Sequence, residues 1–329
     1  MDFRKLRVIF FGMSSRYTVD VLEKVAEKHD LVGIVESAPR HMNINATLPS
    51  RKTVAKRVVG KLLKGVMKSY RLSDVAKRNN VPYFYMTQDN LQALEIWLRS
   101  QRADIGCVAS LSQLLKLDII KIFPKGIINL HPALLPKYRG PNPWFWTYYE
   151  MERTGGVTVH YIDAGEDTGD ILLQSEFPIP LGMTFTEMND IAIRLGADLM
   201  VQALNEIVRD IQQPKTQRHL KTLPRARNIK RDEPLIDWEN WPIERVWHML
   251  KGSQPWLDAL PPPSSPLQGL CSWQIQGYEK IRISGGAYGK VFKDSQGWYV
   301  ALPEGRIRLK VNFRIRALLG KLATKVLTF

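Results

Sequence analysis

The chain has 329 residues, of which 44% are hydrophobic and 24% charged, and its formal net charge is +15 at pH 7. This length suffices for two domains with separate cores, and the composition is that of an ordinary globular protein rather than a disordered or fibrous one. Two cysteines and no apolar run long enough to cross a bilayer argue against a disulfide framework and a membrane-spanning protein, so we expect a cytoplasmic location.

Strand-like and helix-like patterns alternate along the first 130 residues. Residues 6–12 read LRVIFFG, a nearly continuous apolar run that predicts a buried parallel strand, and apolar periodicity predicts a helix over 17–28. The next predicted elements are a strand over 31–35, a helix over 72–79, a strand over 81–85, a helix over 90–100, a strand over 105–110, a short helix over 117–122 and a strand over 126–130. This alternation is typical of an α/β protein with a Rossmann-like, mostly parallel sheet, although residues 11–15 lack the G-x-G-x-x-G pattern of dinucleotide sites.

A long basic segment, residues 37–71, interrupts this alternation. Apolar residues recur four positions apart within it, at Val54, Val58, Leu62, Val66 and Tyr70. Lysines and arginines occupy much of the remaining surface, which predicts a basic amphipathic helix weakened by two internal glycines. We expect this helix to lie on the α/β domain with a solvated basic face. The alternatives are a clamp for tRNA or another polyanion, in line with the net charge, and a peripheral contact with a membrane surface.

The stretch from Gly126 to Gly169 places polar residues at the ends of two predicted strands. Asn129 and His131 close the first strand, and a second strand over 157–162 runs into an acidic turn that contains Asp167. Polar side chains at the carboxyl edge of an open sheet are typical of an active site. Each of the three also fits a turn or a helix cap when taken singly, so the prediction depends on their joint occurrence.

The rest of the chain predicts the end of this domain and a second module. A long helix over 183–212 closes a first domain of residues 1–213, and the polar tract 214–234 reads as a linker. The module of residues 235–329 opens with a helix over 243–250. Its predicted strands span 272–275, 280–284, 289–293, 298–302 and 306–316. This pattern favours a small OB-like β-barrel domain. Its last strand alternates apolar residues with basic ones, for which we expect a solvated outer face, with contact to phosphates as the alternative.

Four motifs in the stretch from Gly126 to Gly169 together resemble the folate-dependent formyltransferase family. They are Asn129-x-His131-Pro132, the LLPKYRG loop over 134–140, Thr158-x-His160 and Asp167-Thr168-Gly169. The resemblance covers most of residues 6–212. It implies the formyltransferase fold and an enzyme that transfers a formyl group from 10-formyltetrahydrofolate, a cosubstrate used without a metal, to an amine. It also implies that Asn129, His131 and Asp167 are the catalytic residues.

The chemistry of formyl transfer gives each of these three side chains a role. The carbonyl oxygen gains negative charge during acyl transfer, and Asn129 offers it a neutral N–H donor. His131 serves as a second donor while charged or as a proton shuttle. Asp167 holds His131 in its useful tautomer and accepts the amine proton, directly or through water. Losing one such donor commonly costs about a hundredfold or more in rate.

The resemblance assigns further residues to a cleft at the carboxyl edge of the sheet. The family binds the pterin largely through backbone groups of two loops. The matching positions here are Ser112, Gln113, Leu115, Asp163, Gly165 and Glu166. Thr158 and His160 match supporting positions, with core packing as the alternative for His160. Lys137 and Arg139 of the LLPKYRG loop are expected to be available to a negatively charged acceptor, with a rigid, proline-pinned cover as the alternative for this loop.

Two acceptors remain open. Methionyl-tRNA is favoured by the net charge, by the basic segment and by residues 236–256, which resemble the start of the C-terminal domain of methionyl-tRNA formyltransferases. A nucleotide-linked amino sugar is favoured by residues 142–146, NPWFW, and by loops after the first two strands that depart from the patterns of the tRNA enzymes. The alternative from another class is a non-catalytic RNA-binding protein on the same fold, against which the complete trio of polar residues argues.

Overall fold

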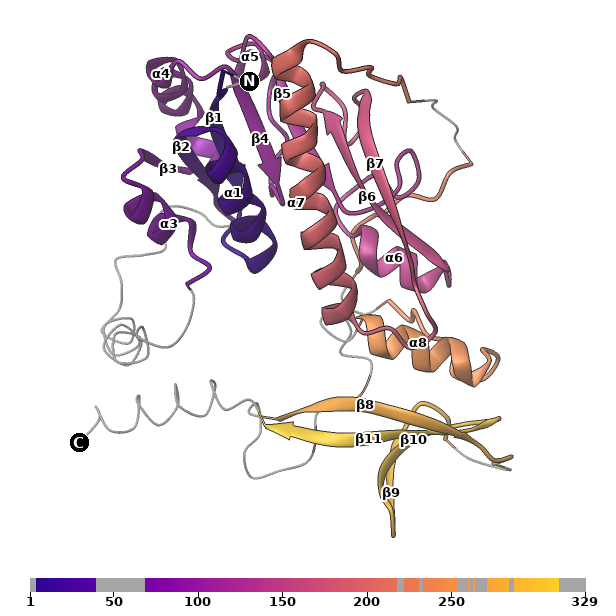
Figure 1. Ribbon diagram of the computed structural model, residues 1–329. Coiled ribbons are helices and arrows are strands. Elements are labelled where there is room, and N and C mark those ends of the chain that lie inside the picture. The colour runs from indigo at the N-terminus through magenta and orange to yellow at the C-terminus, as the bar shows by residue number, and fades with distance from the viewer. Residues whose placement is uncertain are drawn as a thin grey trace, which may run out of the picture.

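The computed structural model describes residues 4–39, 69–217, 222–230, 233–253, 260, 263, 271–283 and 287–313 (Figure 1). These ranges contain an α/β unit, in which helices cover both faces of a central sheet, and a smaller unit of one helix and an antiparallel sheet. The predicted basic amphipathic helix lies outside the described residues as far as residue 68.

The central sheet has, within the described residues, seven strands in the order β3-β2-β1-β4-β5-β6-β7. The strands from β3 to β5 pair in parallel, whereas β6 and β7 are antiparallel to their neighbours. The bounds are β1 Arg7–Gly12, β2 Asp30–Ser37, β3 Tyr83–Met86, β4 Ile105–Ala109, β5 Ile127–His131, β6 Thr154–Tyr161 and β7 Ile171–Pro178. Strand β4 is buried along its whole length because helices cover both faces. The predicted Rossmann-like, mostly parallel sheet is confirmed.

Helices α1 and α7 lie side by side on one face of the sheet (Figure 1). Ser15 caps the first turn of α1, and Thr184 with Glu187 forms a capping box at the start of α7. Helix α4 packs on the opposite face through Leu94 and Leu98. The bounds are α1 Arg16–Lys28, α3 Leu72–Asn79, the 3-10 turn η1 Gln88–Asn90, α4 Leu91–Gln101, α5 Leu117–Ile120, α6 Pro143–Tyr149 and α7 Phe185–Arg209.

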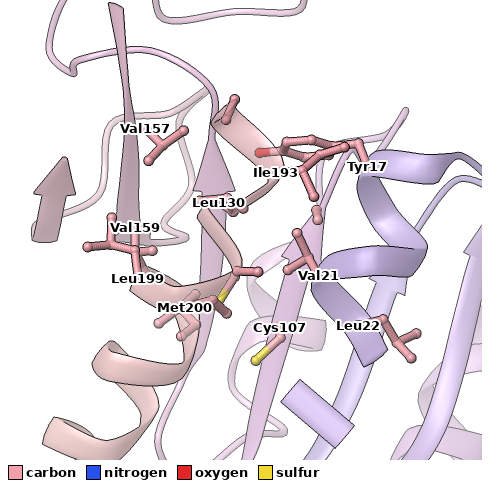
Figure 2. Close-up of a cluster of buried hydrophobic side chains, with 14 of the residues drawn as sticks. Tyr17, Val21, Leu22, Cys107, Leu130, Val157, Val159, Ile193, Leu199 and Met200 are labelled. Atoms are coloured by element: carbon pink, nitrogen blue, oxygen red, sulfur yellow. The ribbon is translucent and has the colours of Figure 1, made fainter. Parts of the chain in front are cut away.

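The core between α1, α7 and the sheet is drawn in Figure 2. The labelled residues are Tyr17, Val21 and Leu22 of α1, Ile193, Leu199 and Met200 of α7, and Cys107, Leu130, Val157 and Val159 of the sheet. Gly196 of α7 faces Leu130 of β5, since a Cβ atom at Gly196 would lie 2.6 Å from Cδ2 of Leu130. The missing side chain at Gly196 therefore lets α7 pack closely against the strand that carries Asn129 and His131.

The smaller unit consists of α8 (Ile243–Ser253) and a sheet in the order β8-β11-β10-β9. The bounds are β8 Cys271–Lys280, β9 Val291–Asp294, β10 Gly297–Leu302 and β11 Gly305–Phe313. The strand predicted over 280–284 does not form separately, because β8 continues to Lys280 and residues 281–283 are outside any strand. The predicted alternation of the last strand is present, with Ile307 and Leu309 buried on one face.

Two of the basic residues on the other face of β11, Arg306 and Arg308, form ion pairs. Arg306 and Arg308 each contact both Glu279 and Asp294, with nitrogen–oxygen distances of 2.6 to 2.9 Å. Their charge is therefore neutralised within the sheet, and they do not provide the open phosphate contact that the alternation suggested.

Helix α8 is anchored on the α/β unit by specific contacts. The backbone N–H of Gly182 donates to Nδ1 of His248 at 2.9 Å, and the His248 ring lies 4.8 Å from the ring of Tyr148. Arg245 donates to the backbone carbonyl of Tyr149 at 2.9 Å. These contacts fix α8 against α6 and the loop that precedes α7.

The tract predicted as a linker packs along the α/β unit before it reaches α8. Lys215 exchanges two backbone hydrogen bonds of 2.8 Å with Ile171 of β7. Ala226 is fully buried, donates to the carbonyl of Arg139 at 2.8 Å and accepts from the N–H of Asn142 at 3.1 Å. The described parts of this tract therefore belong to the structure of the α/β unit.

Candidate active site

Four polar side chains, from β5, β6 and the turn after β6, meet beside these two antiparallel strands. Asn129 and His131 are two positions apart on β5 and therefore share one face of the strand. The antiparallel register places His160 of β6 opposite Asn129. Asp167 lies in the turn between β6 and β7. The structure thus brings together the three residues predicted to be catalytic and adds His160 to them.

The carboxylate of Asp167 is the centre of this cluster. Its Oδ1 accepts from Nδ2 of Asn129 at 3.4 Å and lies 3.6 Å from Nε2 of His160. Its Oδ2 lies 3.5 Å from Nδ1 of His131 and accepts from the backbone N–H of Gly140 at 2.9 Å. Nδ2 of Asn129 also lies 3.1 Å from Nε2 of His160. One carboxylate therefore faces two imidazoles, an amide and a backbone N–H.

Contacts with backbone carbonyls show which ring nitrogen carries the hydrogen in His131 and in His160. Nε2 of His131 lies 2.9 Å from the carbonyl oxygen of Tyr138, and Nδ1 of His160 lies 2.8 Å from that of Tyr161. A carbonyl oxygen only accepts hydrogen bonds, so each of these nitrogens carries a hydrogen. In the neutral imidazole, Nδ1 of His131 is then an acceptor that faces the Asp167 carboxylate. A single proton placed between the two would satisfy both.

Burial and mutual contacts shift the pKa values of this pair. Burial alone would raise the pKa of Asp167, but its interactions with His131, His160 and the N–H of Gly140 hold that pKa well below its usual range. Burial lowers the pKa of His131 from its ordinary value, and the charge of Asp167 opposes this effect. The site therefore holds, at neutral pH, an ionised carboxylate beside an imidazole that can take up one proton.

The backbone of Asp167 is held by a residue outside the motifs. Asp167 has a left-handed backbone, with φ of 54°. Nε2 of the buried Gln217 donates to the carbonyl oxygens of Asp167 and Gly169 at 3.1 and 2.6 Å, and its Oε1 accepts from Nε and Nη2 of Arg139 at 3.0 and 2.7 Å. No sequence pattern marked Gln217 as a site residue, because it lies in a tract without periodicity or motif.

The cluster borders a pocket of about 710 Å³. This volume lies within the range of roughly 300 to 1,000 Å³ that is usual for small-molecule sites. The predicted site residues that line it are Asn129, His131, His160, Asp167, Ser112, Gln113, Leu115, Asp163, Gly165 and Glu166. Every position predicted to bind the pterin therefore borders the same cavity as the predicted catalytic trio.

Thr158, Lys137 and Arg139 have other surroundings. Oγ1 of Thr158 donates to the carbonyl of Ala133 at 2.6 Å, so Thr158 shapes the loop that leaves β5. Nζ of Lys137 lies 3.2 Å from Oε1 of Glu152 beside a second cavity of about 260 Å³. Arg139 is buried in the hydrogen bonds described above. That Lys137 and Arg139 contact an acceptor stays a prediction.

Further residues line the pocket that the sequence did not assign to it. Tyr17, Trp144 and Phe185 form an aromatic row with edge-to-face contacts, the ring centroids lying 5.7 and 5.2 Å apart. Trp144 belongs to the NPWFW sequence, which was its only signal. Asn228 also lines the pocket and comes from the tract read as a linker, where no sequence pattern marked it.

Within the described ranges there is neither a metal-ligand cluster nor a membrane-spanning helix. No group of three or more His, Cys, Asp or Glu side chains there is arranged to hold a metal ion. None of the helices in the same ranges combines the length and apolar character needed to span a membrane. Cys107 and Cys271 are both buried and free.

The chain is similar to known formyltransferases in sequence and in fold. A model of the formyl transferase family matches residues 38–204. The methionyl-tRNA formyltransferase of Roseiflexus sp. (strain RS-1) is 30% identical over 258 residues, covering 77% of this chain and 72% of that protein. The enzyme of the same name from Acetivibrio thermocellus is 26% identical over 308 residues, covering 93% and 91%. An N-formyltransferase of Helicobacter canadensis, solved with folinic acid and dTDP-3-aminofucose, shares the fold with a TM-score of 0.60 and 17% identity over 92% of this chain and 97% of that one.

Proposed function

Since this chain belongs to the formyl transferase family, we propose that it transfers a formyl group from 10-formyltetrahydrofolate to a primary amine. The observation that carries the proposal is the meeting of Asn129, His131 and Asp167 at the wall of one pocket of small-molecule size. The arrangement offers an N–H donor for a carbonyl oxygen and a place for a proton, which are the two requirements of acyl transfer to an amine.

The pocket suits a folate as the donor. A flat heteroaromatic ring needs apolar contacts on its faces and hydrogen-bonding groups around its edge. Leu111, Leu115 and Ile162 supply apolar walls, and the backbone of residues 110–113 and 163–167 supplies polar groups beside them. The bound donor would supply an activated formyl carbon, and these residues would hold it next to the polar trio.

Asp167 and His131 take up the proton that the amine loses. The Asp167 carboxylate alone is a weak base, because its pKa lies well below the usual range. Nδ1 of His131 faces the same carboxylate at 3.5 Å and is an acceptor in the neutral imidazole. A proton received by this pair is stabilised by both groups, since the ionised carboxylate favours the imidazolium as it forms.

Asn129 is the donor for the carbonyl oxygen. Its amide nitrogen contacts His160 at 3.1 Å and Asp167 at the longer distance of 3.4 Å. The longer contact is the weaker one, so the N–H that makes it is the one for which a substrate oxygen with developing negative charge competes. His160 retains the other contact and orients the amide.

Separate observations support two acceptors. Methionyl-tRNA is supported by the two relatives named above, which share sequence over most of this chain, and by the net charge of +15. A nucleotide-linked amino sugar is supported by the ligand of the Helicobacter canadensis protein and by the aromatic row of Tyr17, Trp144 and Phe185 at the pocket. We place methionyl-tRNA first, because the sugar enzyme resembles the chain at the level of fold.

The test uses the full-length chain and both classes of acceptor. The protein is incubated with 10-formyltetrahydrofolate and either charged initiator tRNA or a panel of nucleotide-linked amino sugars, and formylated products are identified by mass spectrometry. Formylation of methionyl-tRNA supports the first acceptor, and formylation of the sugars alone excludes it. No formylation of either acceptor by protein that binds the folate would contradict the proposed function.

The variants Asn129→Ala and Asp167→Ala provide the control for this test. Both remove groups of the proposed machinery and leave the remaining surface intact, so formyl transfer should be lost while folding is retained. A non-catalytic RNA-binding protein would instead show no transfer with the intact chain and unchanged RNA binding in both variants.

A further inference from the structure

We propose that Gln217 is a positioning residue for formyl transfer, whose carboxamide holds the backbone of Asp167 so that the carboxylate faces His131. The inference rests on the proposed function and extends the site to a residue beyond the stretch that carries the motifs. Gln217 lies between α7 and α8, in the tract that packs along the α/β unit.

Gln217 uses the full hydrogen-bonding capacity of its side chain. The residue is 4% exposed. Its amide nitrogen donates to the carbonyls of Asp167 and Gly169, and its amide oxygen accepts twice from Arg139, at the distances given above. A buried amide with all partners in place is costly to lose, because each partner is then left without its hydrogen bond.

These contacts join the two segments that hold Asp167. Gly140 donates its backbone N–H to the carboxylate of Asp167, and the neighbouring Arg139 is linked through Gln217 to the carbonyl of the same residue. Asp167 is therefore held at its side chain by Gly140 and at its backbone by Gln217, and Gln217 is in turn bound by Arg139, the neighbour of Gly140. The backbone next to Gln217 is itself held in place, because Lys215, two residues earlier, pairs with Ile171 of β7.

Asp167 needs this support because its backbone is in the left-handed region, with φ of 54°. That conformation is unfavourable for residues other than glycine, although Asp and Asn tolerate it best. Without Gln217 the turn can relax and move the carboxylate away from His131. A displacement of about 1 Å in a reacting group can cost as much as about a hundredfold in rate.

Two variants disrupt the hydrogen bonds of the Gln217 carboxamide in different ways. Gln217→Glu keeps an acceptor for Arg139 but points a carboxylate oxygen at two carbonyls, and Gln217→Met keeps the volume and removes all four hydrogen bonds. We expect kcat to fall by about tenfold or more in both, with KM for the formyl donor changed by less than about threefold. Gln101→Met, which removes an amide that contacts Trp97 and Ser100 far along the chain, is the matched control and should retain wild-type kcat.

The pKa of His131 is a second measurement, and it would not change if Gln217 only stabilised the fold. The groups that act on its charge are Asp167, His160 and Glu166, and of these Asp167 raises the pKa of His131 most. Both variants should therefore lower the pKa of His131, measured by NMR of the histidine-labelled full-length protein, and move the matching limb of the kcat profile to lower pH. Wild-type kcat in both variants, or an unchanged His131 pKa, would overturn the proposal. If the wild-type chain transfers no formyl group, the proposed function fails, and the NMR titration still decides the role of Gln217.

Discussion

At the scale of single residues, Asp167 is the charged group that the other polar residues of the site surround. Its side chain is 16% exposed and ionised, and a buried charge persists only where partners replace the lost water. Those partners are His131, His160, Asn129 and the backbone of Gly140. Each partner therefore both stabilises the ionised carboxylate and fixes its orientation.

Removing the amide of Asn129 should affect the reaction more than donor binding. We expect Asn129→Ala to lower kcat by about a hundredfold or more, because the carbonyl oxygen loses its donor, while affinity for a folate analogue stays within a few fold. Steady-state kinetics and equilibrium binding measure the two effects. Asn79→Ala, which removes an amide bonded to Val75 on α3, is the control and should be active. Equal losses of kcat and of affinity would argue against this role.

The charge of Asp167 should contribute stability with a defined pH dependence. Its pKa is held below the usual range in the fold, while in the unfolded chain it lies near the ordinary value of about 3.9. The contribution is therefore complete above about pH 4 and is lost as the pH falls further toward the folded-state pKa. Urea unfolding of the wild type and Asp167→Asn should show a difference that is largest near neutral pH and shrinks on acidification below about pH 4. A difference independent of pH would contradict this account.

The sequence identified the site residues that lie within local motifs. Asn129 and His131 stand at the end of one strand and Asp167 follows the next strand, all within one short stretch. Strand patterns and motif together therefore predict that the three lie close to one another. Gln217 and Asn228 could not be found in this way, because their positions depend on how a tract without periodicity crosses the folded unit. Gln217 binds the backbone carbonyl groups of Asp167 and Gly169, and every residue type has such a group. A contact of this kind therefore leaves no pattern in the sequence.

At the scale of elements, the positions of α7 and α8 control the geometry of the neighbouring loops. Helix α7 approaches β5 closely at Gly196, directly behind the strand that ends in His131. Helix α8 contacts the loop before α7 through His248 and Gly182. Changes in either helix therefore reach the site through packing.

Adding a methyl group at Gly196 should disturb β5. Gly196→Ala places Cβ 2.6 Å from a terminal carbon of the buried Leu130, so that side chain or the helix must shift. Overpacking costs about 1 to 3 kcal/mol and helix propensity returns up to about 1 kcal/mol, so we expect a net loss of stability and lower activity. Thermal unfolding and kinetics test this, with the exposed Gln202→Ala on the same helix as control. Greater stability with full activity would show that α7 does not need this close approach.

The contact of α8 should weaken in acid. Burial lowers the pKa of His248 to about 4, below its ordinary value of 6.5. The unfolded chain therefore binds the proton first, and stability that is complete above pH 6.5 is lost as the pH falls toward 4, by up to about 1.4 kcal/mol per pH unit. His248→Gln keeps an acceptor for Gly182 and removes the titration. Its stability should fall less between these pH values than that of the wild type, which denaturant unfolding measures.

Patterns of apolar residues predicted most elements of the α/β unit, since its strands are buried runs and its helices have one apolar face. They did not specify that β6 and β7 are antiparallel to their neighbours, because direction depends on connections rather than on composition. They also divided β8 into two strands at Gly277, where no other atom approaches within 4 Å of an added Cβ and the chain continues without a turn. A glycine in an open position of a strand resembles a turn signal.

At the scale of the whole molecule, the excess of positive charge should appear in the kinetics if the acceptor is a nucleic acid. We expect log kcat/KM for methionyl-tRNA to fall linearly with log salt between about 50 and 200 mM, because bound lysines and arginines release counterions from the phosphates. A nucleotide-linked sugar has few phosphates, and its slope should be shallow. Kinetics with both acceptors over this range measure the difference. A flat profile for methionyl-tRNA would show that the net charge does not act in binding it.

Residues 222–230 pack on the α/β unit although they follow α7. This packing determines where the sequences of two related proteins can be joined in a chimaera. A chimaera joined directly after α7 would take Asn129, His131 and Asp167 from one parent. Ala226 and Asn228, which pack beside the pocket, would come from the other parent. A crossover between residue 230 and the start of α8 at Ile243 would instead exchange the smaller unit and keep the pocket from a single parent.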